Sequence, residues 1–290
     1  MPGPASPDLS KRLAMELKIN LVPVVSKKFP DGESGIRING KIRGKNVVIV
    51  QTTSPPQDKR MMQLFLLAYA AKDQTARKIT TVVPYFAYSR QDKVFLSGEA
   101  FSAKIVVDIL KACGVDQMIT VNAHNPAALA SFSILVKDVS AIPLLAKYFK
   151  DKGYEGAVSL SMGKKGLATA KEAAQILKGP FDYVSTQRDR HTGKVSIEEK
   201  PLELKGKIAI FFDDIISSGG TMIKAVAHAK NQGAAEVYAA CVHPLLMADA
   251  EKKILQSGAD GVIGTDTVPS LVSVVSVAPV IAKALRELGA

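Results

Sequence analysis

The stretch of residues 206–221 constrains the fold of this chain more than any other. An apolar run at residues 208–212 has the length of a strand and ends in two adjacent carboxylates, Asp213 and Asp214. A Ser-Ser-Gly-Gly-Thr turn follows, and a pattern typical of a helix opens at Thr221. The stretch therefore predicts a strand, a tight loop and a helix in succession, which is the repeating unit of α/β proteins with parallel sheets.

The loop has the composition of a phosphate-binding site. Gly219 and Gly220 allow the backbone to turn tightly and to bring N–H groups close to an anion. The following helix adds its unpaired N–H groups and the positive end of its dipole, and Ser217, Ser218 and Thr221 add hydroxyl donors. The two acids would repel a phosphate, so we expect them to bind neighbouring hydroxyl groups or a metal. Ribose 5-phosphate offers both a phosphate and a diol; an ordinary strand-to-helix turn capped by Asp is the alternative.

Strand and helix patterns alternate along two halves of the chain. Residues 44–84 and 206–244 both begin with Gly-Lys, continue through a strand, a loop and a helix, and end on a strand that closes with proline. We therefore predict an α/β protein of two duplicated domains, each with a mostly parallel, doubly wound sheet. The expected bounds are 1–140, 141–275 and a helix in 276–290 that packs back on the first domain. The first copy has Thr-Thr-Ser-Pro-Pro in its loop, so only the second is suited to phosphate.

Composition limits the partners. The 290 residues are 47% hydrophobic and 22% charged, as in globular proteins, and carry a net charge of +11. Because the lysines and arginines are spread along the chain and there is no Trp, this charge favours polyphosphate substrates over nucleic acid. Cys113 and Cys241 stand in apolar surroundings without the spacing of a disulfide framework or a zinc site. The longest apolar stretch, residues 271–285, is interrupted by polar residues, so we expect a cytoplasmic protein without a membrane segment.

Several motifs, taken in order, resemble those of one enzyme family. They are Phe-Pro-Asp-Gly-Glu at residues 29–33, Ser-Pro-Pro at 54–56, Tyr-Phe-Ala-Tyr-Ser-Arg-Gln-Asp-Lys at 85–93, His124, and the loop at 213–221. Together they are similar to ribose-phosphate pyrophosphokinases, the phosphoribosyl diphosphate (PRPP) synthetases. The resemblance covers nearly the whole chain and implies two domains of the type I phosphoribosyltransferase kind.

The resemblance implies a reaction and a set of residues for it. The reaction is transfer of the β,γ-diphosphoryl group of Mg-ATP to the anomeric hydroxyl of ribose 5-phosphate, which gives PRPP and AMP. The implied ATP site consists of Phe29, Asp31, Gly32, Glu33, Arg90, Gln91, Asp92 and His124. The implied ribose 5-phosphate site consists of Asp213, Asp214, Ser217, Ser218, Gly219, Gly220 and Thr221. The candidate catalytic groups are Arg188, Arg190 and Lys194.

The same resemblance implies a cofactor and an assembly. Mg²⁺ is the expected cofactor, and His124 is its expected protein ligand. Phe29, Asp31 and Glu33 are expected to close around the adenine bound to a neighbouring subunit. The expected assembly is therefore a homo-oligomer, either a dimer or a hexamer.

Three positions depart from the family pattern. Gly163 stands where a metal-binding Asp is expected, Asn122 replaces the acid two residues before His124, and Thr186 replaces a catalytic Lys. The cationic loop at residues 163–166 and the basic residues 190 and 194 are candidates for compensation. Two further interpretations follow. One is a non-catalytic, regulatory paralogue that binds nucleotide or ribose phosphate and associates with a paralogous synthetase subunit, and the other is a different phosphoribosyltransferase-type enzyme.

Overall fold

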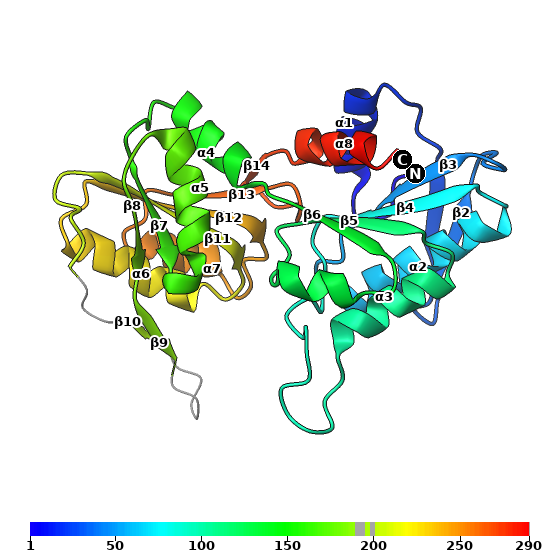
Figure 1. Ribbon diagram of the computed structural model, residues 1–290, viewed down its shortest axis with the longest axis horizontal. Coiled ribbons are helices and arrows are strands. Elements are labelled where there is room, and N and C mark those ends of the chain that lie inside the picture. Colours follow the sequence, from blue (N-terminus) through cyan, green and yellow to red (C-terminus); the bar gives the residue numbers. More distant parts are fainter. Residues whose placement is uncertain (189–194, 198–200, 290) are drawn as a thin grey trace. The chain divides into compact units, whose positions relative to one another are not determined.

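The computed structural model describes residues 1–188, 195–197 and 201–289. The chain divides into two compact units (Figure 1), of which the first is Met1–Ser140 with Val277–Ala290 and the second is Ala141–Ser276. No helix in the described part of the chain combines the length and the apolar character needed to cross a membrane.

The first unit is built on a four-stranded sheet with the order β3-β4-β5-β6, in which every pair is parallel. Its strands are β3 (Asn46–Val50), β4 (Lys78–Val83), β5 (Gln117–Val121) and β6 (Leu135–Val139). Two helices, α2 (Gln57–Asp73) and α3 (Ser102–Ala112), lie on one side of the sheet, and α1 (Pro7–Leu17) and α8 (Ala278–Glu287) on the other (Figure 1). Because helices cover both faces, strands β4 and β5 are almost entirely buried.

Shorter elements complete the first unit. An antiparallel hairpin, β1 (Val24–Lys28) and β2 (Ser34–Ile38), packs against α2 through β2. A 3-10 helix, η1 (Pro126–Ser131), follows β5. Helix α8 packs on α1, where the Arg286 Nη2 atom donates to the Glu16 carbonyl oxygen over 2.6 Å. The C-terminal helix is thus part of the first unit.

The second unit has a six-stranded, fully parallel sheet with the order β14-β13-β12-β11-β7-β8. Its strands are β7 (Val158–Met162), β8 (Phe181–Val184), β11 (Ile208–Ile216), β12 (Glu236–Pro244), β13 (Gly261–Thr265) and β14 (Ser273–Val275). Helices α4 (Ile142–Asp151) and α5 (Leu167–Leu177) cover one face, and α6 (Gly220–Asn231) and α7 (Ala250–Gln256) cover the other (Figure 1). A 3-10 turn, η2 (Lys164–Gly166), precedes α5, and β9 (Thr186–Arg188) pairs with β10 (Val195–Ile197).

The central strand β11 alternates between the two faces of this sheet. Phe211 lies in the core cluster that includes Val226 of α6. Phe212 packs edge-on against Phe149 of α4, with 6.1 Å between the ring centroids. Since side chains alternate along a strand, Asp213 follows Phe211 toward the α6 side and Asp214 follows Phe212 toward the α4 side. Near the carboxyl end of β11, one acid therefore lies on each face of the sheet.

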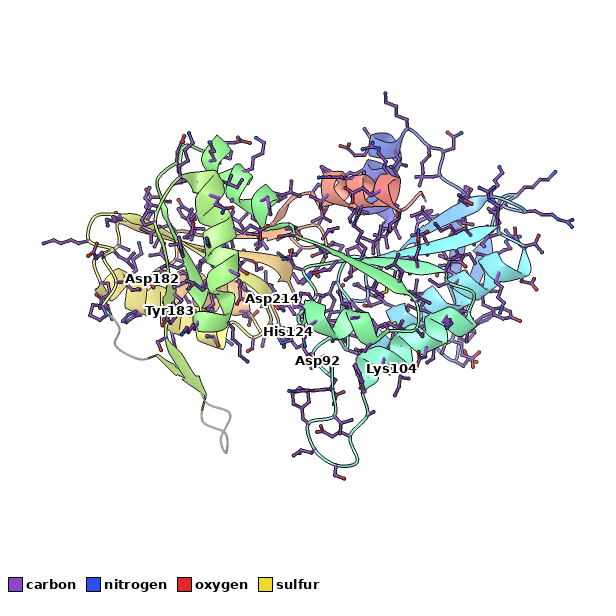
Figure 2. The ribbon with its side chains drawn as sticks, in the orientation of Figure 1. Asp92, Lys104, His124, Asp182, Tyr183 and Asp214 are labelled. Carbon is purple, nitrogen blue, oxygen red and sulfur yellow. The ribbon has the colours of Figure 1, made fainter. Side chains whose placement is uncertain are left out.

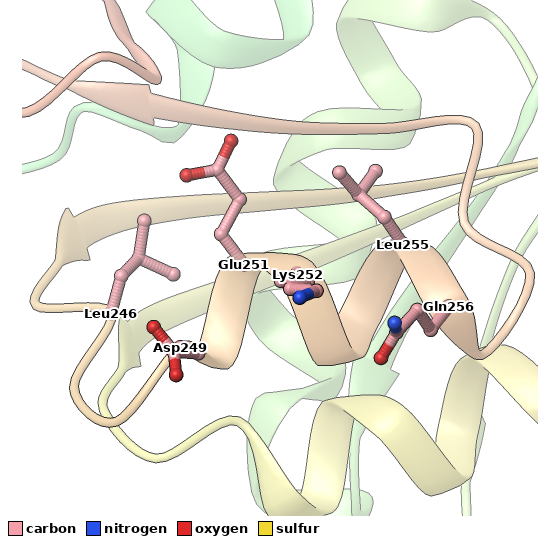
Figure 3. Close-up of a pocket in the computed structure, with 6 residues that line it drawn as sticks. All are labelled: Leu246, Asp249, Glu251, Lys252, Leu255 and Gln256. Atoms are coloured by element: carbon pink, nitrogen blue, oxygen red, sulfur yellow. The ribbon is translucent and has the colours of Figure 1, made fainter.

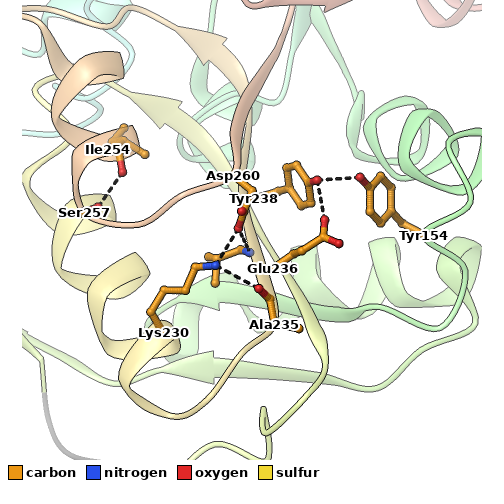
Figure 4. A network of polar contacts seen from close by, with 9 residues as sticks. Tyr154, Lys230, Ala235, Glu236, Tyr238, Ile254, Ser257 and Asp260 are labelled. Atoms are coloured by element: carbon orange, nitrogen blue, oxygen red, sulfur yellow. Dashed lines mark hydrogen bonds and ion pairs between the residues drawn. The ribbon is translucent and has the colours of Figure 1, made fainter.

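Polar side chains at the opposite edge of this sheet are paired with one another (Figure 4). The Tyr238 hydroxyl donates to the Glu236 carboxylate over 2.7 Å and lies 2.6 Å from the Tyr154 hydroxyl. Lys230 forms an ion pair of 2.8 Å with Asp260. These side chains satisfy each other's hydrogen-bonding groups and hold the amino end of β12.

The predicted α/β class with parallel sheets is confirmed.

Candidate functional site

The loop between β11 and α6 presents unpaired hydrogen-bond donors. Gly219 has φ 74°, a left-handed conformation that glycine adopts without strain, and it directly precedes the first turn of α6. Among the described residues no side chain caps α6, so the N–H groups of its first turn have no partner within the helix. The hydroxyl groups of Ser217, Ser218 and Thr221 make no hydrogen bond with any described residue. The loop is therefore rich in donors that an anion would satisfy.

The two loop glycines have different surroundings. A Cβ atom at position 219 would lie 3.2 Å from the Cβ atom of Ala250 and 3.2 Å from the Cδ1 atom of Ile254, so Gly219 is packed against α7. A Cβ atom at position 220 would have no neighbour within 4 Å. Gly220 therefore faces open space in front of the helix, where a ligand group can approach the backbone.

Both acids at the end of β11 are half-buried and bonded to the backbone that follows them. The Asp213 carboxylate accepts from the Asp214 N–H over 2.9 Å, and the Asp214 carboxylate accepts from the Ile215 N–H over 2.8 Å. Asp213 lies opposite Cys241 of β12. Burial raises the pKa of the Cys241 thiol, and the negative charge of Asp213 raises it further. Each carboxylate is thus oriented by the backbone N–H of the following residue.

The neighbouring strand β7 brings a cationic loop to the same edge. Strands β7 and β11 are parallel and in register, with Leu160 opposite Phe211, so the residues that follow Met162 lie beside the two acids. Gly163 has φ 71° and ψ 167°, a conformation accessible almost only to glycine. Lys164 and Lys165 are exposed, and neither forms an ion pair with any described residue. Acids, hydroxyls and free ammonium groups therefore share one edge of the second sheet.

A polar cluster further along this edge faces inward. His243 is 2% exposed, and its Nδ1 atom lies 2.9 Å from the Thr267 hydroxyl. The hydroxyl groups of Thr265 and Thr267 each donate to the Val242 carbonyl oxygen over 2.7 Å. These residues hold strands β12 and β13 together.

In the first unit, the turn between β1 and β2 is exposed. The Phe29 N–H donates to the Glu33 carbonyl oxygen over 2.8 Å, the Asp31 carboxylate accepts from the Glu33 N–H over 3.1 Å, and Gly32 has φ 103°. The Lys27 ammonium group lies 4.3 Å from the centroid of the Phe29 ring. The turn is therefore locally fixed, with its side chains available to a ligand or a partner.

The Arg-Gln-Asp segment and His124 meet at the carboxyl end of the first sheet, where Figure 2 labels Asp92 and His124. Arg90 and His124 are exposed. The Gln91 side-chain oxygen accepts from the Ser102 hydroxyl over 2.5 Å, and Asp92 accepts from the side-chain amide of Asn125. The nearby aromatic side chains differ in exposure: Tyr85 and Phe86 are buried, whereas Tyr88 is exposed.

One polar residue of this region was not predicted from the sequence. Asp138 of β6 accepts from the Ala123 N–H over 2.9 Å, directly beside Asn122, and burial raises its pKa to about 6. A single acid in a strand is a weak signal, because only the pairing of β5 with β6 shows which backbone group it meets.

Of the three candidate catalytic residues, Arg188 lies in a described element, strand β9. Arg188 is opposite Val195, and Thr186 is opposite Ile197. Arg190 and Lys194 lie outside the described residues. Within the described ranges, no three His, Cys, Asp or Glu side chains are grouped closely enough to hold a metal by themselves.

A surface pocket of about 400 Å³ lies on α7, and none of the predicted residues lines it (Figure 3). Its lining residues are Leu246, Asp249, Glu251, Lys252, Leu255 and Gln256. The segment before α7 is bonded to the β11–α6 connection, since the Met247 N–H donates to the Ser217 carbonyl oxygen over 3.0 Å. The pocket is therefore next to the loop but separate from its open side at Gly220.

Comparison with known proteins identifies the family. Residues 1–114 match the N-terminal domain of ribose phosphate pyrophosphokinase, and residues 140–265 match the phosphoribosyl transferase domain. The chain is 40% identical to the ribose-phosphate pyrophosphokinase of Saccharolobus solfataricus, over 92% of this chain and 91% of that protein. It is 39% identical to that of Methanothermobacter thermautotrophicus, over 98% of both.

A solved structure agrees with these matches. The crystal structure of phosphoribosylpyrophosphate synthetase from Mycobacterium smegmatis is 28% identical, aligns with a TM-score of 0.87, and covers 99% of this chain and 97% of that one. The predicted resemblance is thus confirmed, and the chain belongs to the ribose-phosphate pyrophosphokinase family.

Proposed function

We propose that this protein transfers diphosphate from Mg-ATP to ribose 5-phosphate and releases PRPP and AMP. The observation that carries the proposal is the β11–α6 loop, which combines two oriented carboxylates with unpaired N–H and hydroxyl donors. The relatives from Saccharolobus solfataricus and Methanothermobacter thermautotrophicus are both named for this activity. A phosphate suits the donors at residues 217–221, and the sugar hydroxyls suit the carboxylates, which accept hydrogen bonds.

The acids also suit Mg²⁺. This cation prefers oxygen ligands and commonly takes one or two protein carboxylates together with substrate oxygens. Asp213 and Asp214 are the residues that would hold it at the ribose, and its chemistry there would be to neutralise phosphate charge. His124 remains the predicted metal ligand of the first unit, where Asn122, two residues earlier, has an amide in place of the expected acid.

Lys164 and Lys165 are our candidates for binding the diphosphate. Phosphoryl transfer depends mainly on positioning and on neutralising phosphate charge. Two ammonium groups without ion-pair partners among the described residues supply such charge beside the ribose site. Arg188, Arg190 and Lys194 remain the proposed catalytic cations. The proposed donor site comprises Arg90, Gln91 and His124, with the turn at residues 29–33 reaching a neighbouring subunit of a homo-oligomer.

A non-catalytic, regulatory paralogue is the second candidate. It is favoured by the residues at two positions where the resemblance implies metal-side carboxylates, since Gly163 and Asn122 cannot ionise. Such a protein would keep the ribose phosphate loop and would associate with a catalytic synthetase subunit.

Product analysis tests these candidates. Mg-ATP and ribose 5-phosphate are incubated with the wild type and with Asp213→Ala, and AMP and PRPP are measured. The synthetase proposal expects both products from the wild type and a loss of at least roughly a hundredfold in the variant. No product from the wild type, together with ribose 5-phosphate binding and association with an active synthetase, would support the regulatory candidate. Release of pyrophosphate from PRPP and a nucleobase would instead indicate a different phosphoribosyltransferase.

A further inference from the structure

The turn that carries His124 is held by two acids from different segments. This turn, residues 122–125, follows β5 and is called the His124 turn below. On one side, Asp138 of β6 accepts from the Ala123 N–H over 2.9 Å. On the other side, Asp92 accepts from the side-chain amide of Asn125. The two acids thus hold the beginning and the end of the turn.

The Asp138 carboxylate is hydrogen-bonded to the backbone and not to a cationic side chain of any described residue. It makes no ion pair with any described residue, and its carboxylate is mostly buried. Strand pairing brings it to the turn, because β6 runs parallel to β5 and the Asn122 N–H donates to the Val139 carbonyl oxygen over 2.9 Å. Asn122 itself has φ 42°, a left-handed conformation that asparagine tolerates better than most residues. An acid buried without a cation is costly, so its hydrogen bonds to backbone must offset that cost.

Asp92 links the turn to the segment that carries Arg90 and Gln91. The partner side chain, Asn125, uses both ends of its amide: its nitrogen donates to Asp92, and its oxygen accepts from the Ala127 N–H over 3.2 Å. Gln91 is fixed in turn, since its backbone oxygen accepts from the Ala103 N–H over 3.2 Å. A chain of hydrogen bonds therefore runs from α3 through residues 91–92 to the His124 turn.

We propose that Asp92 and Asp138 are positioning residues that hold the His124 turn against the Arg90–Gln91 segment, with Asp92 acting through Asn125 and not on the nucleotide. The resemblance assigns Asp92 to ATP directly, whereas its carboxylate is engaged by Asn125. The expected effect on Mg-ATP binding rests on the proposed function. The expected effect on hydrogen exchange of the turn's backbone does not depend on any ligand.

A reciprocal exchange of side chains tests the Asp92 contact. Asn125→Asp places two carboxylates face to face but can still accept from the Ala127 N–H. The double variant Asp92→Asn/Asn125→Asp restores a donor and an acceptor in the opposite sense. We expect the single variant to weaken Mg-ATP binding, measured by calorimetry, roughly tenfold. We expect the double variant to recover to within about threefold of the wild type.

Hydrogen exchange at the Ala123 amide is the second readout. The single variant should speed this exchange roughly tenfold because the turn opens more often, and the double variant should restore protection. Asn20→Asp is the matched control, since it adds the same charge at an exposed position of the same unit. An Asn125→Asp protein that behaves like Asn20→Asp in exchange, or a double variant as defective as the single one, would overturn the inference. If the wild type binds no Mg-ATP, the proposed donor site fails, and the exchange rates still decide the positioning role.

Two substitutions test Asp138 in the same way. Asp138→Asn keeps an oxygen that accepts from the Ala123 N–H, and Asp138→Ala removes it. Protection of the Ala123 amide should survive in the Asn variant and fall in the Ala variant, with Mg-ATP affinity following the same order. Equal protection in both variants would contradict the proposed role. If the Ala variant does not fold, loss of protection in the folded Asn variant would contradict it.

Discussion

Gly219 lies so close to Ile254 that a Cβ atom added to the glycine would sit 3.2 Å from the Cδ1 atom of the isoleucine. The next residue, Gly220, would meet nothing within 4 Å. The two glycines of the loop therefore serve different purposes. The first lets the loop pack on α7 in a left-handed conformation, and the second leaves room in front of the α6 amino end.

This difference predicts opposite effects of two single methyl additions. Gly219→Ala should lower the free energy of unfolding by about 1–2 kcal/mol, because alanine is strained at positive φ and crowds Ile254. Gly220→Ala should leave stability unchanged or slightly improved, since it adds a better helix former. It should still weaken ribose 5-phosphate binding roughly tenfold, because the methyl group occupies ligand space. Urea unfolding and calorimetry measure the two quantities, and full affinity in Gly220→Ala would argue against a ligand at that position.

The paired lysines after β7 predict a salt-sensitive diphosphate site. Lys164→Gln/Lys165→Gln should weaken pyrophosphate binding on the order of tenfold at low ionic strength, with a smaller difference in high salt. Lys171→Gln, an exposed lysine of the same helix region, is the control and should bind like the wild type. Unchanged affinity in the double variant would remove these lysines from the site.

The backbone at Gly163 predicts that restoring an acid there is costly. Gly163→Asp should destabilise the protein by about 1–3 kcal/mol, because a side chain is strained at φ 71° and ψ 167°. Gly163→Ala carries the same strain without the charge, so it should cost a similar amount in urea unfolding. Wild-type stability in both variants would show that the loop readily adopts another conformation.

The sequence was sufficient for the fold and for the loop at residues 213–221, because strand, glycine turn and helix are local patterns. The sequence was less informative where the structure depends on which strands pair and in which register. The bounds of the first strand, Val24–Lys28, follow from its hairpin partner Ser34–Ile38 and not from a local pattern. Asp138 was missed because its hydrogen bond depends on the register of a neighbouring strand. The roles of the Thr265 and Thr267 hydroxyl groups likewise depend on pairing, because both donate to the Val242 carbonyl oxygen of the neighbouring strand.

Asp138 also predicts a pH dependence of stability. Burial raises its pKa from 3.8 to about 6, so the folded protein holds a proton more tightly than the unfolded chain. The contribution of the protonated Asp138 carboxyl group to the free energy of unfolding is therefore complete below about pH 4 and is lost as the pH rises through 6. Relative to Asp138→Asn, which does not titrate, the wild type should lose about 2–3 kcal/mol between pH 4 and pH 7. Parallel urea titrations of the two proteins give this difference, and a constant gap would contradict the raised pKa.

The most direct test of the central claim is a ³¹P NMR time course of the wild type with Mg-ATP and ribose 5-phosphate. Transfer of diphosphate predicts that AMP and a diphosphate joined to the sugar appear together in equal amounts. It also predicts that Asp213→Ala gives neither at a comparable rate. Formation of ADP and a ribose bisphosphate, or no change in either substrate while ribose 5-phosphate binds, would contradict the synthetase account.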